Sequence, residues 1–233
     1  MDNWIDFYDS AHSIYVNARH RDIHYHRIAE DIAAYVRPNA TVVDYGCGEA
    51  LHADIIAAKA LRLILVEPAP SVRARLAQRF GANAKIAIRD GLAAMADGSA
   101  DLVVMHSVAQ YLAPGELDAL LARFARLLAP DGLLIVGDVI PPGRSAFADA
   151  GELLRFAARN GFFFAALAGL ARTTLSPYRK LRARLGLARY DEAALTKKLA
   201  AAGFSATRAP ANIGHNRGRM TFLARPAGSP VRG

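Results

Sequence analysis

The sequence has a single cysteine, Cys47, which excludes an intramolecular disulfide and fits a reducing compartment. It also lacks an apolar segment of membrane-spanning length, because the uncharged run at 161–171 is well short of the ~20 residues that a spanning helix needs. The first six residues contain no basic stretch followed by an apolar one. We therefore expect no secretory signal and a cytoplasmic location.

Acidic residues are scarce in one segment of a chain whose net charge is +8. Between residues 151 and 190, Glu152 is the only acid. The basic residues of that segment are Arg155, Arg159, Arg172, Arg179, Lys180, Arg182, Arg184 and Arg189. The phenylalanines at 162–164 are clustered instead of alternating with basic residues, which argues against nucleic-acid binding. Two interpretations stay open: a segment that faces lipid or an anionic membrane surface, peripheral at the inner face, or a helical lid with solvated arginines.

The order of expected elements predicts an α/β fold of one domain with an insertion, since 233 residues with 53% apolar content can bury a substantial core. Strands are expected at 41–44, 61–66, 85–89, 102–105, 133–136, 204–207 and 220–224. Helices are expected at 4–36, 50–60, 71–80, 116–128 and 191–202, with Ser71 as the N-cap of the third and residues 129–132 ending the fourth. This alternation indicates a doubly wound, mostly parallel, seven-stranded Rossmann-like sheet.

The predicted organisation has five parts. They are an N-terminal helical cap at 1–38, a ligand-binding core at 39–140, a basic, phenylalanine-rich helical insertion at 141–190, a C-terminal helix with closing strands at 191–226, and a tail at 227–233.

A glycine turn follows the first expected strand and indicates the kind of ligand. Gly46 and Gly48 allow close approach of a ligand, as in dinucleotide-binding folds, but Leu51 stands where a third glycine would complete that fingerprint. Asp44 and Glu49 place negative charge where a pyrophosphate would lie, which argues against a nicotinamide dinucleotide. S-adenosylmethionine (SAM) has no phosphate and carries a sulfonium and an ammonium, so it suits this turn.

A second acid, Glu67, ends the buried strand expected at 61–66, at the spacing of a ribose-binding carboxylate. Together with Asp90 and the run at 101–106, the motif at 44–48 resembles the class I SAM-dependent methyltransferases of the small-molecule branch, over roughly residues 35–140. The resemblance implies that the glycine turn holds the methionine part of SAM, Glu67 the ribose and Asp90 the adenine amino group. Ala50 replaces a glycine that is frequent in the family. The predicted cofactor-binding residues are Tyr15, Arg19, Asp44, Gly46, Cys47, Gly48, Glu67, Pro68, Asp90, Gly91 and His106, with Cys47 as a small residue that fills a tight space.

Candidate catalytic residues follow the fourth strand and lie near the end of the chain. His106 is either a general base or a residue that packs against SAM, and Tyr111 lies beside it in the sequence. His215 belongs to the loop at 212–219, which either recognises an anionic acceptor or forms a plain hairpin turn. Related enzymes that methylate the amino groups of nucleic-acid bases have an Asn or Asp, two prolines and an aromatic residue after the fourth strand. The residues at 105–108 lack this motif, which argues against that activity.

The N-terminal helix is rich in histidine, and His20 and His24 have the spacing that puts two imidazoles on one face. No Glu follows His20 and no third ligand is evident, so we expect no metal. A cap over SAM, with Tyr15 or Arg19 contacting the carboxylate of the cofactor, fits better.

The sequence thus predicts a SAM-dependent methyltransferase that acts on O or N of a small-molecule or lipid-like acceptor. A nicotinamide-dependent oxidoreductase and a non-catalytic module with the SAM fold are the alternatives.

Overall fold

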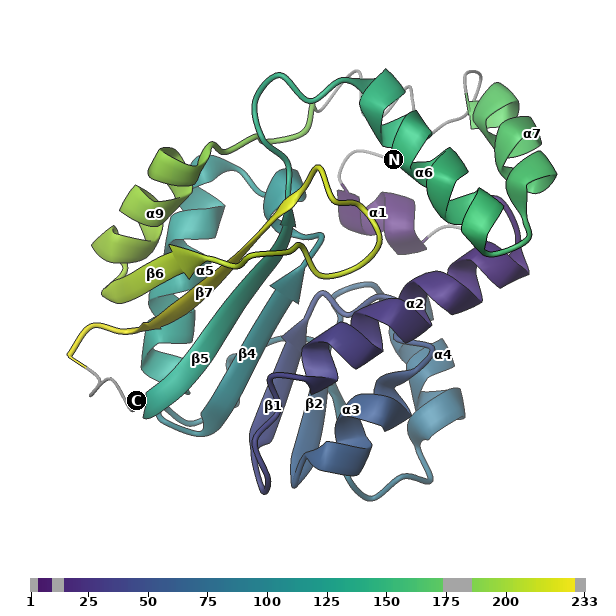
Figure 1. The fold of residues 1–233 in the computed structure, drawn as a ribbon. Coiled ribbons are helices and arrows are strands. Elements are labelled where there is room, and N and C mark those ends of the chain that lie inside the picture. The colour runs from purple at the N-terminus through teal and green to yellow at the C-terminus, as the bar shows by residue number, and fades with distance from the viewer. Residues whose placement is uncertain (1–3, 10–14, 174–185, 229–233) are drawn as a thin grey trace.

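A computed structural model describes residues 4–9, 15–173 and 186–228 (Figure 1). Its centre is a seven-stranded sheet of order β3-β2-β1-β4-β5-β7-β6. The strands are β1 Thr41–Tyr45, β2 Arg62–Val66, β3 Ile86–Arg89, β4 Ala100–His106, β5 Leu128–Val139, β6 Phe204–Arg208 and β7 Met220–Pro226. β1 to β5 pair in parallel, and β7 runs antiparallel to both of its neighbours. The predicted doubly wound, mostly parallel sheet is confirmed.

Helices cover both faces of this sheet (Figure 1). They are α1 Trp4–Asp9, α2 Ala18–Ala33, α3 Ala53–Lys59, α4 Pro70–Phe80, α5 Pro114–Leu127, α6 Ala146–Arg159, α7 Phe163–Thr173 and α9 Glu192–Ala201, with a 3₁₀ turn η1 at Ala109–Tyr111. Successive strand residues point to opposite faces, so Val42 joins the core under α2, α3 and α4, whereas Val43 joins the core under α5 and α9. Burial on both faces explains why the parallel strands are continuous apolar runs.

The N-terminal helix differs from the prediction, because the described residues of this region, 4–9 and 15–36, form two separate helices instead of one. Asn17 is extended, with a φ of −162°, and its side chain accepts a hydrogen bond from the backbone N–H of His20. This N-cap begins α2 and separates it from α1.

Two other predicted boundaries were wrong. α4 begins at Pro70, whose ring suits the first helical position, so Ser71 is not the N-cap; its backbone N–H and hydroxyl donate to Asp9 instead. Residues 129–132 belong to β5, because Leu128 already pairs with Ala100 at the start of β4.

The insertion contributes α6 and α7, which lie side by side next to the N-terminal end of α2 (Figure 1). Arg19 of α2 donates from Nε to the carbonyl of Asn160 between these helices at 2.7 Å. Arg179, Lys180, Arg182 and Arg184 of the predicted basic segment lie outside the described residues. Within the described ranges, no helix combines the length and the apolar character needed to cross a membrane.

Candidate active site

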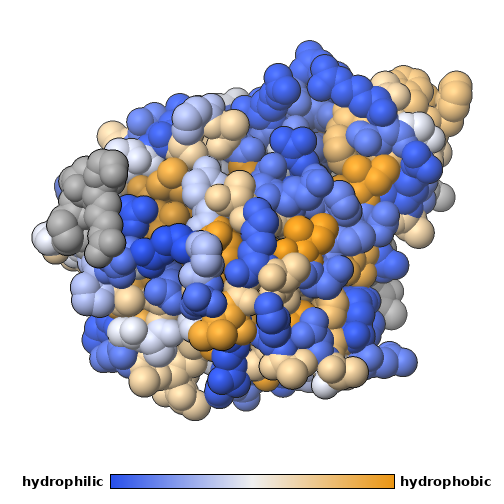
Figure 2. Space-filling view, turned by 60° about the horizontal axis from the view of Figure 1, so that its bottom comes forward, coloured by the Kyte–Doolittle hydropathy of each residue, from blue (hydrophilic) through white to orange (hydrophobic). Residues whose placement is uncertain are grey.

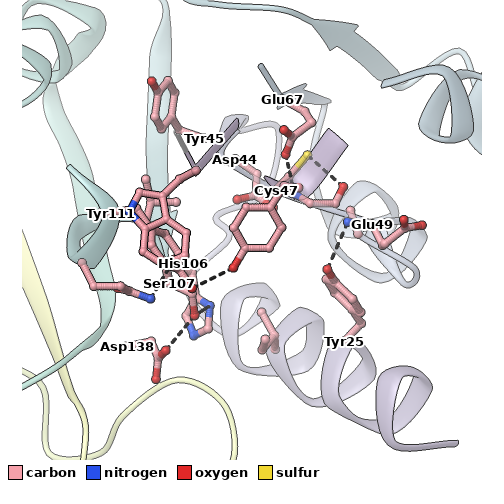
Figure 3. Close-up of a pocket in the computed structure, with 18 of the residues that line it drawn as sticks. Tyr25, Asp44, Tyr45, Cys47, Glu49, Glu67, His106, Ser107, Tyr111 and Asp138 are labelled. Carbon is pink, nitrogen blue, oxygen red and sulfur yellow. Dashed lines mark hydrogen bonds between the residues drawn. The ribbon is translucent and has the colours of Figure 1, made fainter. Parts of the chain in front are cut away.

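A cavity of about 1070 Å³, here called the main cavity, lies at the carboxyl ends of β1, β2, β4 and β5. In doubly wound sheets this edge is where ligands bind. α1 and α2 also contribute to its lining, so helices from the N-terminus complete the site (Figure 3).

The glycine turn after β1 requires glycine for conformation and for space. Gly46 and Gly48 have φ values of +70° and +57°, a region that most side chains avoid. A Cβ on Gly46 would approach Val108 to 2.5 Å, and one on Gly48 would approach the hydroxyl of Tyr25 to 2.8 Å. The same hydroxyl accepts from the backbone N–H of Glu49 at 3.0 Å, which ties α2 to the turn.

Two buried carboxylates, Asp44 and Glu67, flank this turn (Figure 3). Burial raises the pKa of Asp44 to about 7, and repulsion by Glu67 adds to the effect. Burial also raises the pKa of Glu67, although its oxygens accept from the N–H groups of Ala69 and Gly48. Unbalanced buried carboxylates favour a cationic ligand.

Two neighbours of the turn have other roles. Glu49 pairs with Arg75 at 2.7 Å and with Arg79 at 3.4 Å, so its charge is compensated at α4. Burial raises the pKa of the Cys47 thiol well above its ordinary value, which opposes a nucleophilic role and agrees with a space-filling one.

On the β4 and β5 side, a chain of hydrogen bonds joins His106, Ser107 and Asp138 (Figure 3). His106 Nε2 lies 3.2 Å from the carbonyl oxygen of Ile213, and its Nδ1 lies 3.1 Å from Ser107 Oγ. Ser107 Oγ donates to Asp138 Oδ2 at 2.7 Å. Asp138 was not among the predicted site residues, although it follows the apolar run of β5 just as His106 ends that of β4.

A smaller cavity of about 210 Å³, here called the histidine chamber, adjoins the main cavity and is lined partly by His20, His24, His106 and His215. His24 and His215 approach through their Nδ1 atoms at 3.3 Å. Burial lowers the pKa of His20 to about 4 and also lowers the pKa of His24 and His215. These three imidazoles are therefore neutral at physiological pH.

Aromatic rings hold this chamber together. His215 stacks on Phe156 with ring centroids 4.3 Å apart, and His20 stacks on Phe162 at 5.2 Å. Across the part of the chain that the structure describes, no group of three or more His, Cys, Asp or Glu has a metal-binding arrangement.

Most of the predicted site residues meet at the main cavity. Those that line it are Tyr15, Asp44, Gly46, Cys47, Gly48, Glu67, Pro68, His106, Tyr111 and His215. Arg19, Asp90 and Gly91 do not line it, since Arg19 binds Asn160 and Asp90 is exposed after β3.

Several lining residues carried no signal in the sequence. Trp4 and Tyr8 of α1 pack on Tyr111, with Trp4 and Tyr111 centroids 4.4 Å apart and a 2.7 Å bond between the two tyrosine hydroxyls. Tyr25, Asp138 and Arg219 are also among the lining residues. Their positions depend on contacts between distant segments.

Comparison with known proteins identifies the core. Residues 43–136 match the sequence model of a methyltransferase domain. The carboxy-S-adenosyl-L-methionine synthase of Alteromonas mediterranea is 30% identical over 129 residues, which are 52% of this chain and 53% of that protein. The chain thus spans about half the length of this relative.

Solved structures share the fold across nearly the whole chain. Magnesium protoporphyrin IX methyltransferase from Synechocystis PCC 6803 with bound SAM is 17% identical, with a TM-score of 0.60 and coverage of 95% of this chain and 94% of that one. The complex of DhpI with S-adenosylhomocysteine is 15% identical, with a TM-score of 0.62 and coverage of 96% and 95%. The predicted resemblance is confirmed for the core and the fold: residues 43–136 match a methyltransferase domain, and the chain shares the fold of these complexes with SAM and S-adenosylhomocysteine.

Proposed function

We propose that this protein transfers the methyl group of SAM to an oxygen or nitrogen atom of a small-molecule or lipid-like acceptor. The supporting observation is the division of the main cavity, which has buried carboxylates and a glycine turn on one side and polar side chains after β4 and β5 on the other. A cationic cofactor fits the first side, and a neutral acceptor fits the second.

The residues around the glycine turn fit SAM by their chemistry. Gly46 and Gly48 leave backbone space for the methionine part, while Asp44 supplies a negative charge for its cationic groups. The carboxylate of Glu67 is held by two backbone N–H groups, which orients it for the ribose hydroxyls. Tyr15, Cys47 and Pro68 complete this side of the cavity. Bound SAM supplies an activated methyl group on a sulfonium.

On the acceptor side, we propose contacts from His106, Tyr111 and His215. The neutral state of His215 suits hydrogen bonding to an uncharged acceptor better than recognition of an anion. Methyl transfer needs in-line approach in a site that excludes water, and the rings of Trp4, Tyr8 and Tyr111 provide apolar surface for this.

Transfer of radiolabelled methyl from SAM to a panel of phenols, quinols, primary amines and phosphatidylethanolamine vesicles tests the activity. We expect labelled product with at least one class, and none with the Glu67→Ala variant. SAM binding without transfer to any acceptor would favour the non-catalytic module.

We further propose that α7 docks on an anionic membrane surface at the inner face. Phe164 and Leu167 are 83% and 51% exposed, and Phe163 lies beside them on the outer face of the helix. Figure 2 shows pale orange, apolar surface projecting at the upper right, the side on which Figure 1 draws α7. The excess of basic residues at 151–190 complements anionic headgroups.

The docking surface differs from the one that the sequence suggested. Phe162 is 4% exposed and stacks on His20, so it holds α7 to the protein and is not available to lipid.

A further inference from the structure

Two neighbouring strand ends share an unusual backbone conformation. Ser107 follows β4 and Asp138 lies near the end of β5, directly after the register pair His106 and Gly137. Both have a positive φ, +59° for Ser107 and +60° for Asp138, where a residue with a side chain is strained. Such strain recurs where a protein aims side chains at a functional position.

The strained pair is joined by its side chains. Ser107 Oγ donates to Asp138 Oδ2 at 2.7 Å, and Arg219 Nη1 lies 3.6 Å from the same oxygen. The backbone N–H of Asp138 donates to Asn212 at 3.1 Å. The side chain of Asp138 is therefore held in place at the wall shared by the main cavity and the histidine chamber.

The ring nitrogens of His106 are not free to take a proton from the acceptor in this arrangement, although the residue lines the cavity. Its Nε2 is bonded to the carbonyl of Ile213, and its Nδ1 lies at hydrogen-bond distance from Ser107. The ring packs closely against Gly137, where a Cβ would approach it to 2.7 Å. The predicted general base thus has both ring nitrogens engaged within the protein.

Of the two carboxylate oxygens of Asp138, Oδ1 has the weaker hydrogen bonding. Oδ1 has one contact, with Asn212 Nδ2, at the limiting distance of 3.5 Å. The nearby cation Arg219 is shared with Asp149 at 2.8 Å, and His215 across the chamber is held neutral by its lowered pKa. Among the described groups on this side of the cavity, Asp138 Oδ1 is the best placed to take a proton.

We propose that Asp138 accepts the proton of an O–H or N–H acceptor during methyl transfer, with Ser107 as its positioning residue; this inference rests on the proposed function. The acceptor atom forms a bond to the methyl carbon as the carbon–sulfur bond breaks, and the electron pair of that bond stays on sulfur in S-adenosylhomocysteine. The O–H or N–H bonding pair stays on the acceptor atom, and its proton moves to Asp138 Oδ1. The acceptor class is a hydroxyl or an amine.

Sinefungin tests this placement without knowledge of the acceptor, because it carries an amine in place of the transferable methyl and its sulfonium. We expect calorimetry to show sinefungin binding about tenfold more tightly than S-adenosylhomocysteine, through contact of the amine with Asp138. In Asp138→Asn the ratio of sinefungin affinity to S-adenosylhomocysteine affinity should fall to about one. The affinity for S-adenosylhomocysteine itself should change less than about twofold. Asp118→Asn, an exposed carboxylate paired with Lys198, is the control that keeps the ratio.

Ser107→Ala is the second variant if Asp138→Asn does not fold. It leaves the carboxylate but removes its 2.7 Å partner, and we expect the ratio to fall about threefold. An unchanged ratio in either folded variant would overturn the role of Asp138 and leave the cofactor site intact. If the wild-type protein binds neither ligand, the proposed function fails as well, and the two failures are thereby distinguished.

Discussion

The two sides of the main cavity are built in different ways. The cofactor side comes largely from one stretch, residues 44–67, which runs from the end of β1 through α3 to the end of β2. The acceptor side combines α1, α2, the ends of β4 and β5, and the loop that carries His215. A local motif makes the first side, whereas packing between distant segments makes the second.

Their electrostatics differ as well. Burial raises the pKa of Asp44 and Glu67 on the cofactor side, so this region gains from a cation. On the acceptor side burial lowers the pKa of three histidines, and Asp138 and Asp149 share the charge of Arg219. The contrast supports the proposal that a charged cofactor binds in the first region and a neutral acceptor in the second.

The strongest test of this contrast is Glu67→Ala. The variant removes the charge-assisted bonds that we propose Glu67 makes to the ribose, each worth about 1.5–3 kcal/mol, so we expect SAM to bind at least about 100-fold more weakly by calorimetry. Glu67→Gln keeps an acceptor for the N–H of Gly48, so this variant should lose less affinity for SAM than Glu67→Ala does. Near-wild-type affinity in Glu67→Ala would show that the cofactor side is wrongly assigned.

A second test concerns the outer surface of the acceptor side. We expect the protein to sediment with phosphatidylglycerol vesicles and not with phosphatidylcholine vesicles. A double variant with Phe164→Ser and Leu167→Ser should bind these vesicles about 30-fold more weakly, because the apolar surface of the two side chains no longer enters the bilayer interface. The matched control is Leu61→Ser, which changes an exposed leucine next to β2, outside the insertion. If the wild-type protein does not sediment, α7 does not dock on membranes.

The smallest expected effect is the pH dependence of SAM binding. Because the pKa of Asp44 is about 7, the ionised fraction rises from about a tenth at pH 6 to about nine-tenths at pH 8. The ionised form attracts the cationic cofactor, so affinity measured by calorimetry should rise about tenfold over this range, with release of a proton on binding at low pH.

Asp44→Asn is the control for this titration, and the rise in affinity should disappear in it. The stability of the ligand-free protein should change in the opposite sense. The folded state holds the Asp44 proton more tightly than the unfolded chain, whose pKa is near 3.8, so this residue's contribution to the free energy of unfolding falls as pH rises from about 4 to about 7. A pH-independent affinity in the wild-type protein would contradict the titration of Asp44.

The alternation of apolar runs and turn residues was enough to predict the sheet and most of its helices. One error was local, because the Asn17 side chain begins α2 by capping a residue three positions further along the chain. Another fell where two segments interact, at Leu128, whose pairing with Ala100 draws residues 129–132 into β5. Ser71 likewise forms a hydrogen bond with Asp9 of α1, a contact that no local sequence pattern predicts.

The sequence by itself determined the fold class, the glycine turn and the acids Asp44 and Glu67, because these depend on residues close together in the chain whose spacing is fixed by a strand, a turn and a helix. Only the tertiary structure decided that Phe162 is buried against His20, that His106 is engaged on both nitrogens, and that Asp138 lies beside Ser107. Apart from the chain neighbours His106 and Ser107, these arrangements bring together residues 31 to 142 positions apart, and which of them meet depends on strand order and helix packing instead of local periodicity.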